Sequence, residues 1–251
     1  MSRMMSSPCQ PRLLDYHIPM SPAPAGGTHV AFFGGSFDPP HIGHVAVARA
    51  AQRALHLDRV LFAPVGLQPL KPTGPSASFE DRVAMTRLAI AGHACFEVSL
   101  ADAPKPAGAT PNFTVDTLTG LRDSLPQEST LFLLLGADSF RALHQWHRAA
   151  ELPFLANFIV ASRPNENLDD LAACLPPGIA LNPLHEQTQD QANRYRLTNG
   201  AGEQSLLTIL PNLHYDISAT QLRNQVHGKA GDKPLLDPAV LAYIHLHHLY
   251  E

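Results

Sequence analysis

The chain has 251 residues, of which 45% are hydrophobic and 16% charged, a composition typical of a globular protein with room for one α/β domain. Its formal charge of −4 argues against a general nucleic-acid-binding protein, and three separated cysteines argue against a disulfide framework or a zinc site. The cysteine pattern fits a reducing compartment, so we expect a cytoplasmic protein. The sequence has neither an apolar run long enough to span a membrane nor the apolar core of a signal peptide.

The first 27 residues differ in composition from the rest of the chain. They are rich in proline and serine and contain few large apolar side chains. Such a segment buries too little apolar surface to offset the entropy of ordering it. We therefore predict a loosely ordered leader over residues 1–27 and one domain over residues 28–251.

That domain is predicted to begin with a strand, a glycine-rich segment and a helix. Val30–Phe33 is a short apolar run typical of a buried strand, and we expect Gly34 and Gly35 to end it in a turn. A helix is predicted to begin near Ile42. Its apolar face has four residues at helical spacing, Val45, Ala48, Ala51 and Leu55.

Two histidines, His41 and His44, lie at the start of this helix. A helix N-terminus carries unpaired N–H groups and a partial positive charge, so it binds anions such as phosphates. Histidines three residues apart are also compatible with solvated surface residues or with a metal pair. The spacing alone leaves these alternatives open.

Strands and helices are predicted to alternate along the rest of the chain. The strands are expected at Arg59–Pro64, Phe96–Leu100, Thr130–Leu135, Phe158–Ala161 and Leu206–Leu210. The helices are expected at Ser78–Ala91, Asn112–Arg122, Phe140–Trp146, Leu168–Leu175, Asp216–Val226 and Pro238–Tyr250. This alternation predicts an α/β fold with a parallel sheet covered on both faces.

Polar and glycine residues follow several of these strands, at the edge where parallel sheets bind ligands. We expect the following residues to converge there: Gly34, His41, His44, Lys71, Asp138, Arg163, Ser218 and Arg223. By position alone, Lys71 is best explained as a solvated loop residue and Ser218 as a helix cap. The polar stretch Asn182–Gly202 carries no readable pattern.

The segment GGSFDPPHIGH at residues 34–44 resembles the GxFxPxHxGH signature of nucleotidyltransferases, whose HIGH tetrad also occurs in class I aminoacyl-tRNA synthetases. Further motifs occur in the order found in bacterial nicotinate-nucleotide adenylyltransferases: FTVDTL at 113–118, LLGADSF at 134–140 with Trp146 beyond it, ASRP at 161–164 and ISATQLR at 217–223. The resemblance extends from His29 to Tyr250. It implies a Rossmann-like, doubly wound parallel sheet of the HIGH-motif nucleotidyltransferase type.

The resemblance also implies a reaction. The family joins the AMP part of ATP to the phosphate of nicotinate mononucleotide, giving deamido-NAD and pyrophosphate, with Mg²⁺ accompanying the ATP. Because the attacking phosphate oxygen is already ionised, catalysis needs positioning and charge neutralisation rather than a serine nucleophile or a strong base. The implied partners are ATP and the mononucleotide, without nucleic acid or membrane, and a homo-oligomer is left open.

Site residues follow from the same resemblance. Catalysis is assigned to His41, His44, Arg223 and Lys71. ATP is expected to contact Gly34, Gly35, His41, His44, Gly136, Asp138, Ser218 and Arg223. The mononucleotide is expected to contact Ser36, Phe37, Thr114, Trp146 and Arg163, with Thr114 and Trp146 framing the nicotinate ring. The chain departs from the family pattern at Leu70, where a histidine is common, and at His147, where a tyrosine is common.

Other functions are compatible with parts of this pattern. One is an adenylyltransferase for nicotinamide mononucleotide or another phosphorylated acceptor such as phosphopantetheine, although FTVDTL and Trp146 favour a pyridine nucleotide. A second is a non-catalytic nucleotide sensor, which the intact His41, His44 and Arg223 disfavour. A tRNA synthetase is disfavoured because the chain is short and has no KMSKS loop and no basic domain.

Overall fold

The computed structural model describes residues 27–70, 74–105, 111–162, 171–184, 192–211, 213, 222–223, 226 and 235–251. Almost all of the expected leader lies outside the described residues, so that prediction stays untested. Lys71, Arg163 and Ser218 also lie outside them, as does most of the helix expected at Asp216–Val226.

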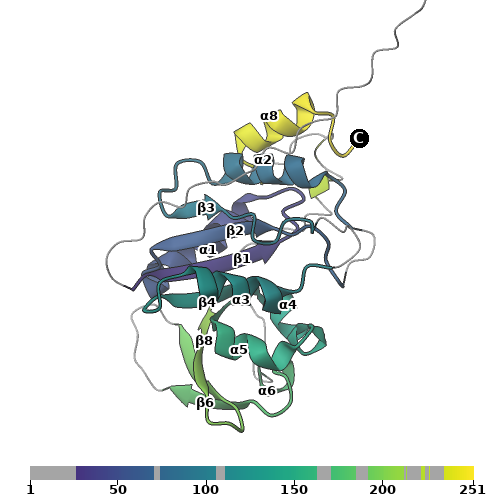
Figure 1. Ribbon diagram of the computed structural model, residues 1–251. Coiled ribbons are helices and arrows are strands. Elements are labelled where there is room, and N and C mark those ends of the chain that lie inside the picture. Colours follow the sequence, from purple (N-terminus) through teal and green to yellow (C-terminus); the bar gives the residue numbers. More distant parts are fainter. Residues whose placement is uncertain are drawn as a thin grey trace, which may run out of the picture.

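An eight-stranded sheet forms the centre of the molecule, in the order β3–β2–β1–β4–β5–β8–β7–β6 (Figure 1). The strands are β1 His29–Gly35, β2 Arg59–Pro64, β3 Phe96–Val98, β4 Thr130–Gly136, β5 Asn157–Ala161, β6 Ala180–Leu184, β7 Asn193–Thr198 and β8 Gln204–Leu210. From β3 to β8 in this order neighbouring strands are parallel. Strand β7 pairs antiparallel with β8, and β6 pairs antiparallel with β7. The predicted parallel α/β sheet is confirmed.

Helices alternate with the parallel strands, as the sequence pattern predicted, and a last helix follows β8. They are α1 Ile42–Leu55, α2 Phe79–Ala89, α3 Thr114–Ser124, α4 Ala137–Arg141, α5 Leu152–Leu155, α6 Leu171–Cys174 and α8 Pro238–Leu246, with short 3₁₀ turns η1 Leu143–Gln145 and η2 Ala149–Glu151. The cap predicted for α2 is present, because the Ser78 hydroxyl accepts a hydrogen bond from the Asp81 N–H. In Figure 1, α8 lies beside α2, at the end of the sheet opposite β6.

Both faces of the sheet are covered, which explains why the central strands are apolar throughout. Alternate residues of β1 enter two different cores. Val30 and Phe32 pack with side chains of α3 and α5, whereas Ala31 and Phe33 pack with the buried alanines of α1. A third cluster joins α2 to α8.

The end of β1 differs from the predicted glycine turn. Gly34 and Gly35 are the last residues of the strand and pair with β2. A Cβ at Gly34 would lie 3.0 Å from the ring of Phe32, and one at Gly35 would lie 3.3 Å from the ring of Phe37. The glycines therefore make room for these rings. The left-handed backbone falls instead on Phe37, with φ 47°, a rare conformation that is held by its fully buried ring.

The predicted helix over Phe140–Trp146 is also wrong as a single element. The helix α4 ends at Arg141, Leu143 begins the turn η1, and Trp146 follows that turn in extended conformation. Phe140 and Leu143 are fully buried in the same core, while Trp146 is only half-buried at its rim. The break after α4 therefore leaves the indole at the rim of this core instead of on the helix that carries Phe140.

The polar stretch Asn182–Gly202 contains most of a β-hairpin that the sequence did not predict. Strand β7 pairs antiparallel with β8 on one side and with β6 on the other. Most residues of the two strands are at least partly exposed, and only Leu197 is fully buried. A hairpin at the end of a sheet buries too few side chains to produce a clear hydrophobic period.

Candidate active site

The chain order reverses between two strands at the middle of the sheet. Strand β1 lies between β2 and β4, so the segments that leave the carboxyl ends of β1 and β4 run to opposite sides. Open α/β sheets bind ligands in the crevice at such a point. Most of the predicted site residues that the structure describes lie at the carboxyl ends of β1 and β4 or in the segments that follow them. The exceptions are Thr114 and Arg223.

A histidine pair forms the start of α1. His41 is the N-cap, and its backbone N–H donates a hydrogen bond to Nδ1 of His44 at 3.1 Å. The centroids of the two imidazole rings lie 3.7 Å apart. Because Nδ1 of His44 is an acceptor, neutral His44 carries its proton on Nε2, which leaves that nitrogen as a hydrogen-bond donor.

Both histidines are neutral near pH 7 in the free protein. Burial lowers the pKa of His41 from 6.5 to about 4, and its side chain is 8% exposed. Burial and the neighbouring His41 lower the pKa of His44 well below 6.5. Nδ1 of His41 is buried and has no hydrogen-bond partner among the described residues. The N–H groups of Ile42 and His44 are already bonded, to the carbonyls of Leu235 and His41. The start of α1 therefore combines two neutral imidazoles with the partial positive charge of a helix N-terminus.

Asp38, which sequence reasoning did not select, connects this turn to three distant segments. Its carboxylate accepts hydrogen bonds from the N–H of Ser76 at 2.6 Å, the N–H of Ala77 at 3.1 Å and the hydroxyl of Tyr250 at 2.8 Å. Nη1 of Arg223 donates to the main-chain carbonyl of Asp38 at 2.8 Å and lies 3.6 Å from Oδ2. The structure thus brings Arg223 to the β1 turn, as predicted.

A second cation supports the same turn. Arg82 of α2 is 1% exposed, and its Nη1 donates to the carbonyl of Ser36 at 2.8 Å. Its burial lowers the pKa of the guanidinium. The hydroxyl of Ser36 donates to Gln68 at 3.0 Å. The ring of Phe37 is 1% exposed and packs against His44, so only the backbone of Phe37 is placed to contact a ligand.

The segment after β4 is far more open. Gly136 is the last residue of β4, and Asp138 lies in the first turn of α4 with a side chain that is 67% exposed. Its Oδ1 accepts a hydrogen bond from Arg141 at 3.3 Å. Trp146, the only tryptophan in the chain, is half-buried. These side chains can contact a ligand without rearrangement of the core.

Aromatic stacking joins this segment to the start of α3. The rings of Phe113 and His147 lie 4.2 Å apart, which places Thr114, the first residue of α3, close to the segment that carries Trp146. Phe113 is the N-cap and provides no side-chain acceptor. The N–H groups of Thr114 and Val115 have no acceptor in the described part of the chain. The predicted proximity of Thr114 and Trp146 is thus supported by their neighbours.

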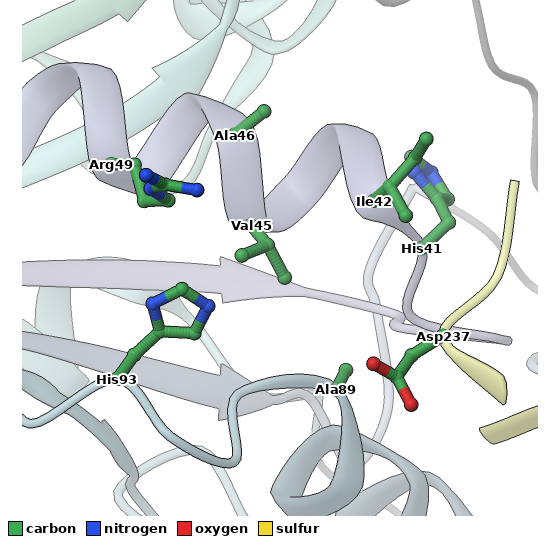
Figure 2. Close-up of a pocket in the computed structure, with 8 residues that line it drawn as sticks. All are labelled: His41, Ile42, Val45, Ala46, Arg49, Ala89, His93 and Asp237. Atoms are coloured by element: carbon green, nitrogen blue, oxygen red, sulfur yellow. The ribbon is translucent and has the colours of Figure 1, made fainter. Parts of the chain in front are cut away.

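A cavity of about 300 Å³ opens beside α1, outside the crevice at the strand ends. Figure 2 shows Val45 of α1 projecting toward Ala89 and His93, with Asp237 at one end of the cavity. Of the predicted site residues that the structure describes, only His41 lines it. The cavity therefore runs along the flank of α1.

Neither a metal centre nor a membrane span is found in the described part of the chain. Its histidine, cysteine, aspartate and glutamate side chains form no group of three or more that could hold a metal ion. None of the helices described above is long and apolar enough to cross a membrane.

Comparisons with known proteins agree with this geometry. A family model described as cytidylyltransferase-like matches residues 32–225. A protein of Gloeobacter violaceus named "Probable nicotinate-nucleotide adenylyltransferase" is 38% identical over 90% of this chain and 97% of its own length. A protein of the same name from Chromobacterium violaceum is 39% identical, over 88% of this chain and 98% of its own length.

Solved structures give the same fold. The nicotinic acid mononucleotide adenylyltransferase of Plasmodium falciparum, complexed with NaAD, superposes with a TM-score of 0.64 at 17% identity, covering 89% of this chain and 97% of that one. The same enzyme complexed with APC gives a TM-score of 0.63 at 15% identity. At these identities the likeness supports the architecture of the sheet and its helices.

Proposed function

The chain belongs to the nicotinate-nucleotide adenylyltransferase family, and we propose that it transfers the AMP part of ATP to nicotinate mononucleotide. A phosphate oxygen of the mononucleotide attacks the α-phosphorus of ATP, a new P–O bond forms, and the bond to the β-phosphate breaks. The products are deamido-NAD and pyrophosphate. The observation that carries the proposal is the neutral His41–His44 pair at the N-terminus of α1.

The β1 end of the crevice fits the phosphates of ATP. Nε2–H of His44 is a donor for phosphate oxygens, and the partial positive charge of the α1 N-terminus favours the same anions. Because the two histidines are neutral, positive charge has to come from elsewhere. Arg223 is beside this turn, and we assign it that role together with Lys71 and with Ser218 as a further donor.

Mg²⁺ would add to this neutralisation by binding phosphate oxygens of ATP. The carboxylate of Asp38, beside the histidine pair, already accepts three hydrogen bonds. The described residues also contain no cluster of ligating side chains. We therefore assign the ion to the phosphates of ATP.

The β4 end of the crevice fits the nucleoside parts. The exposed carboxylate of Asp138 can accept hydrogen bonds from ribose hydroxyls beside Gly136. The half-buried Trp146 offers a ring for stacking on the pyridine. The uncapped start of α3 at Thr114 favours a ring carboxylate over a carboxamide, because the helix N-terminus attracts negative charge. Ser36, the Phe37 backbone and Arg163 remain assigned to the mononucleotide.

A product assay tests this function against its alternatives. Purified protein is incubated with Mg²⁺–ATP and either nicotinate or nicotinamide mononucleotide, and the dinucleotide and pyrophosphate are quantified. We expect deamido-NAD and pyrophosphate in equal amounts with nicotinate mononucleotide and little pyrophosphate without an acceptor. NAD as the preferred product would assign the nicotinamide substrate instead. No pyrophosphate with either acceptor would favour the nucleotide sensor.

A further inference from the structure

Hydrogen-bond donors surround both oxygens of the Asp38 carboxylate. An ionised carboxylate offers about four acceptor positions. The hydroxyl of Tyr250 and the N–H of Ala77 bind Oδ1, while the N–H of Ser76 binds Oδ2 and Arg223 lies 3.6 Å from the same oxygen. The side chain is 4% exposed, so these groups take the place of water.

Arg223 is the charged member of this set and the most loosely held on the carboxylate. Its 3.6 Å separation from Oδ2 is longer than a hydrogen bond, whereas Nη1 donates at 2.8 Å to the main-chain carbonyl of Asp38. The three neutral donors, two backbone N–H groups and the Tyr250 hydroxyl, thus satisfy the carboxylate of Asp38. Without them, that carboxylate would form a close, charge-assisted pair with the guanidinium of Arg223.

We propose that Tyr250 is a positioning residue of the active site: its hydroxyl occupies Asp38 and thereby keeps Arg223 from closing onto the carboxylate and away from the ATP phosphates. This proposal rests on the proposed function, which assigns Arg223 to those phosphates. Without the Tyr250 hydroxyl, Oδ1 of this buried carboxylate keeps only the N–H of Ala77, so its negative charge is less well stabilised. The guanidinium of Arg223, 3.6 Å from Oδ2, then closes onto the carboxylate as the replacement partner.

The structure holds Tyr250 in place for this task. The segment that carries it follows α8, whose buried Val240 and Ile244 belong to the same cluster as Met85 of α2. The Tyr250 hydroxyl also lies 4.0 Å from the sulfur of Met85. Burial, followed by the charge of Asp38, raises the pKa of Tyr250, so the phenol stays protonated and remains a donor at physiological pH.

Tyr243, on the helix α8 that precedes Tyr250, provides a matched control. Its hydroxyl donates to Oδ1 of Asp81 at 3.0 Å, so it also ties α8 to α2, but its acceptor lies outside the Asp38 cluster. The variants Tyr250→Phe and Tyr243→Phe each remove one hydroxyl–carboxylate bond between the C-terminal region and α2 or the β1 turn. A purely structural role predicts the same behaviour for both.

The test compares the full-length protein with these two variants. Calorimetry measures ATP binding, steady-state kinetics give KM for each substrate, and urea unfolding gives stability. We expect Tyr250→Phe to weaken ATP binding and to raise KM for ATP about five- to twentyfold, with KM for the mononucleotide nearly unchanged. Tyr243→Phe should keep the ATP affinity of the wild type. Equal ATP affinity in the two variants would overturn the proposal.

A double-mutant cycle with Asp38 separates the proposed role of Tyr250 from a general loss of stability in Tyr250→Phe. Asp38→Asn preserves the shape of the side chain and removes the charge that attracts Arg223. In this background Tyr250→Phe should change ATP affinity by less than about twofold, and a full-sized effect would contradict the proposal. ATP binding requires no turnover, so a wild type that binds ATP but makes no deamido-NAD would refute the proposed function while the calorimetry still decides the role of Tyr250.

Discussion

The two ends of the crevice are built in different ways. After β1, Asp38 and His41 are almost completely buried and belong to a dense set of contacts. After β4, Asp138 is largely exposed and Trp146 is half-buried. Charge that develops during phosphoryl transfer is best stabilised by groups that are fixed before the substrate arrives. We therefore expect the β1 end to serve the reacting phosphates and the β4 end to serve nucleoside groups that complete their own contacts on binding.

The largest effect is expected at the β1 end. His44→Ala removes the Nε2–H donor, and we expect turnover to fall by roughly 10²–10³. His56→Asn at the opposite end of α1 is the control, because His56 is exposed and caps the helix in a left-handed conformation that asparagine tolerates. Steady-state kinetics on both folded variants measure the difference. Near-normal turnover in His44→Ala would remove this residue from the mechanism.

At the β4 end, a loss of binding should occur without a loss of stability. Asp138→Ala removes acceptors for the ribose hydroxyls, and we expect ATP affinity to fall by about 1.5–3 kcal/mol, or roughly ten- to a hundredfold. Arg141→Ala is the control, since it removes the same surface ion pair while keeping the carboxylate. Both variants should unfold within about 0.5 kcal/mol of the wild type. Equal ATP affinity in the two variants would exclude a direct contact of Asp138 with ATP.

Trp146→Ala tests the aromatic contact of the same end. If the indole stacks on the pyridine ring, the mononucleotide should bind more weakly by about 1–3 kcal/mol, while ATP affinity barely changes. A core tryptophan would instead cost about 3–5 kcal/mol of stability. Mononucleotide Kd, ATP Kd and the urea midpoint should be measured together, with Trp146→Phe as the variant that retains a ring. Unchanged mononucleotide binding with a collapsed midpoint would assign Trp146 to the core.

The last effect is a pH dependence of stability that originates at the β1 end. The unfolded state protonates His41 at its ordinary pKa of 6.5, whereas the folded state protonates it only near 4. Below pH 6.5 the unfolded state therefore binds more protons, and stability falls as the pH falls. From pH 7 to pH 5, His41 alone should remove about 2 kcal/mol from the free energy of unfolding, and His44 acts in the same direction.

Urea unfolding at several pH values checks this slope. The control is His41→Asn, which cannot take up the proton and should reduce the slope between pH 7 and pH 5. An unchanged slope in this variant would mean that His41 is not buried in its neutral form.

The sequence by itself determined the features that depend on neighbours along the chain. The strands β1, β2, β4 and β5 follow from apolar runs, α1 from its helical spacing, and the start of α2 from its Ser78 cap. The polar residues at the strand ends followed from the predicted parallel sheet, so His41, His44 and Arg223 could be placed at one site before their contacts were known.

Only the tertiary structure decided the features that depend on distant contacts. Asp38 meets Arg223 and Tyr250 across 185 and 212 residues of sequence, and no local pattern marks such a pairing. The lowered pKa of His41 comes from burial that several segments create together. The left-handed backbone falls on Phe37 rather than on the glycines because the core fixes its ring. Charge, strain and pKa at this site are set by what the fold packs around each residue, which is why the residue types indicated a phosphate site but could not give its geometry.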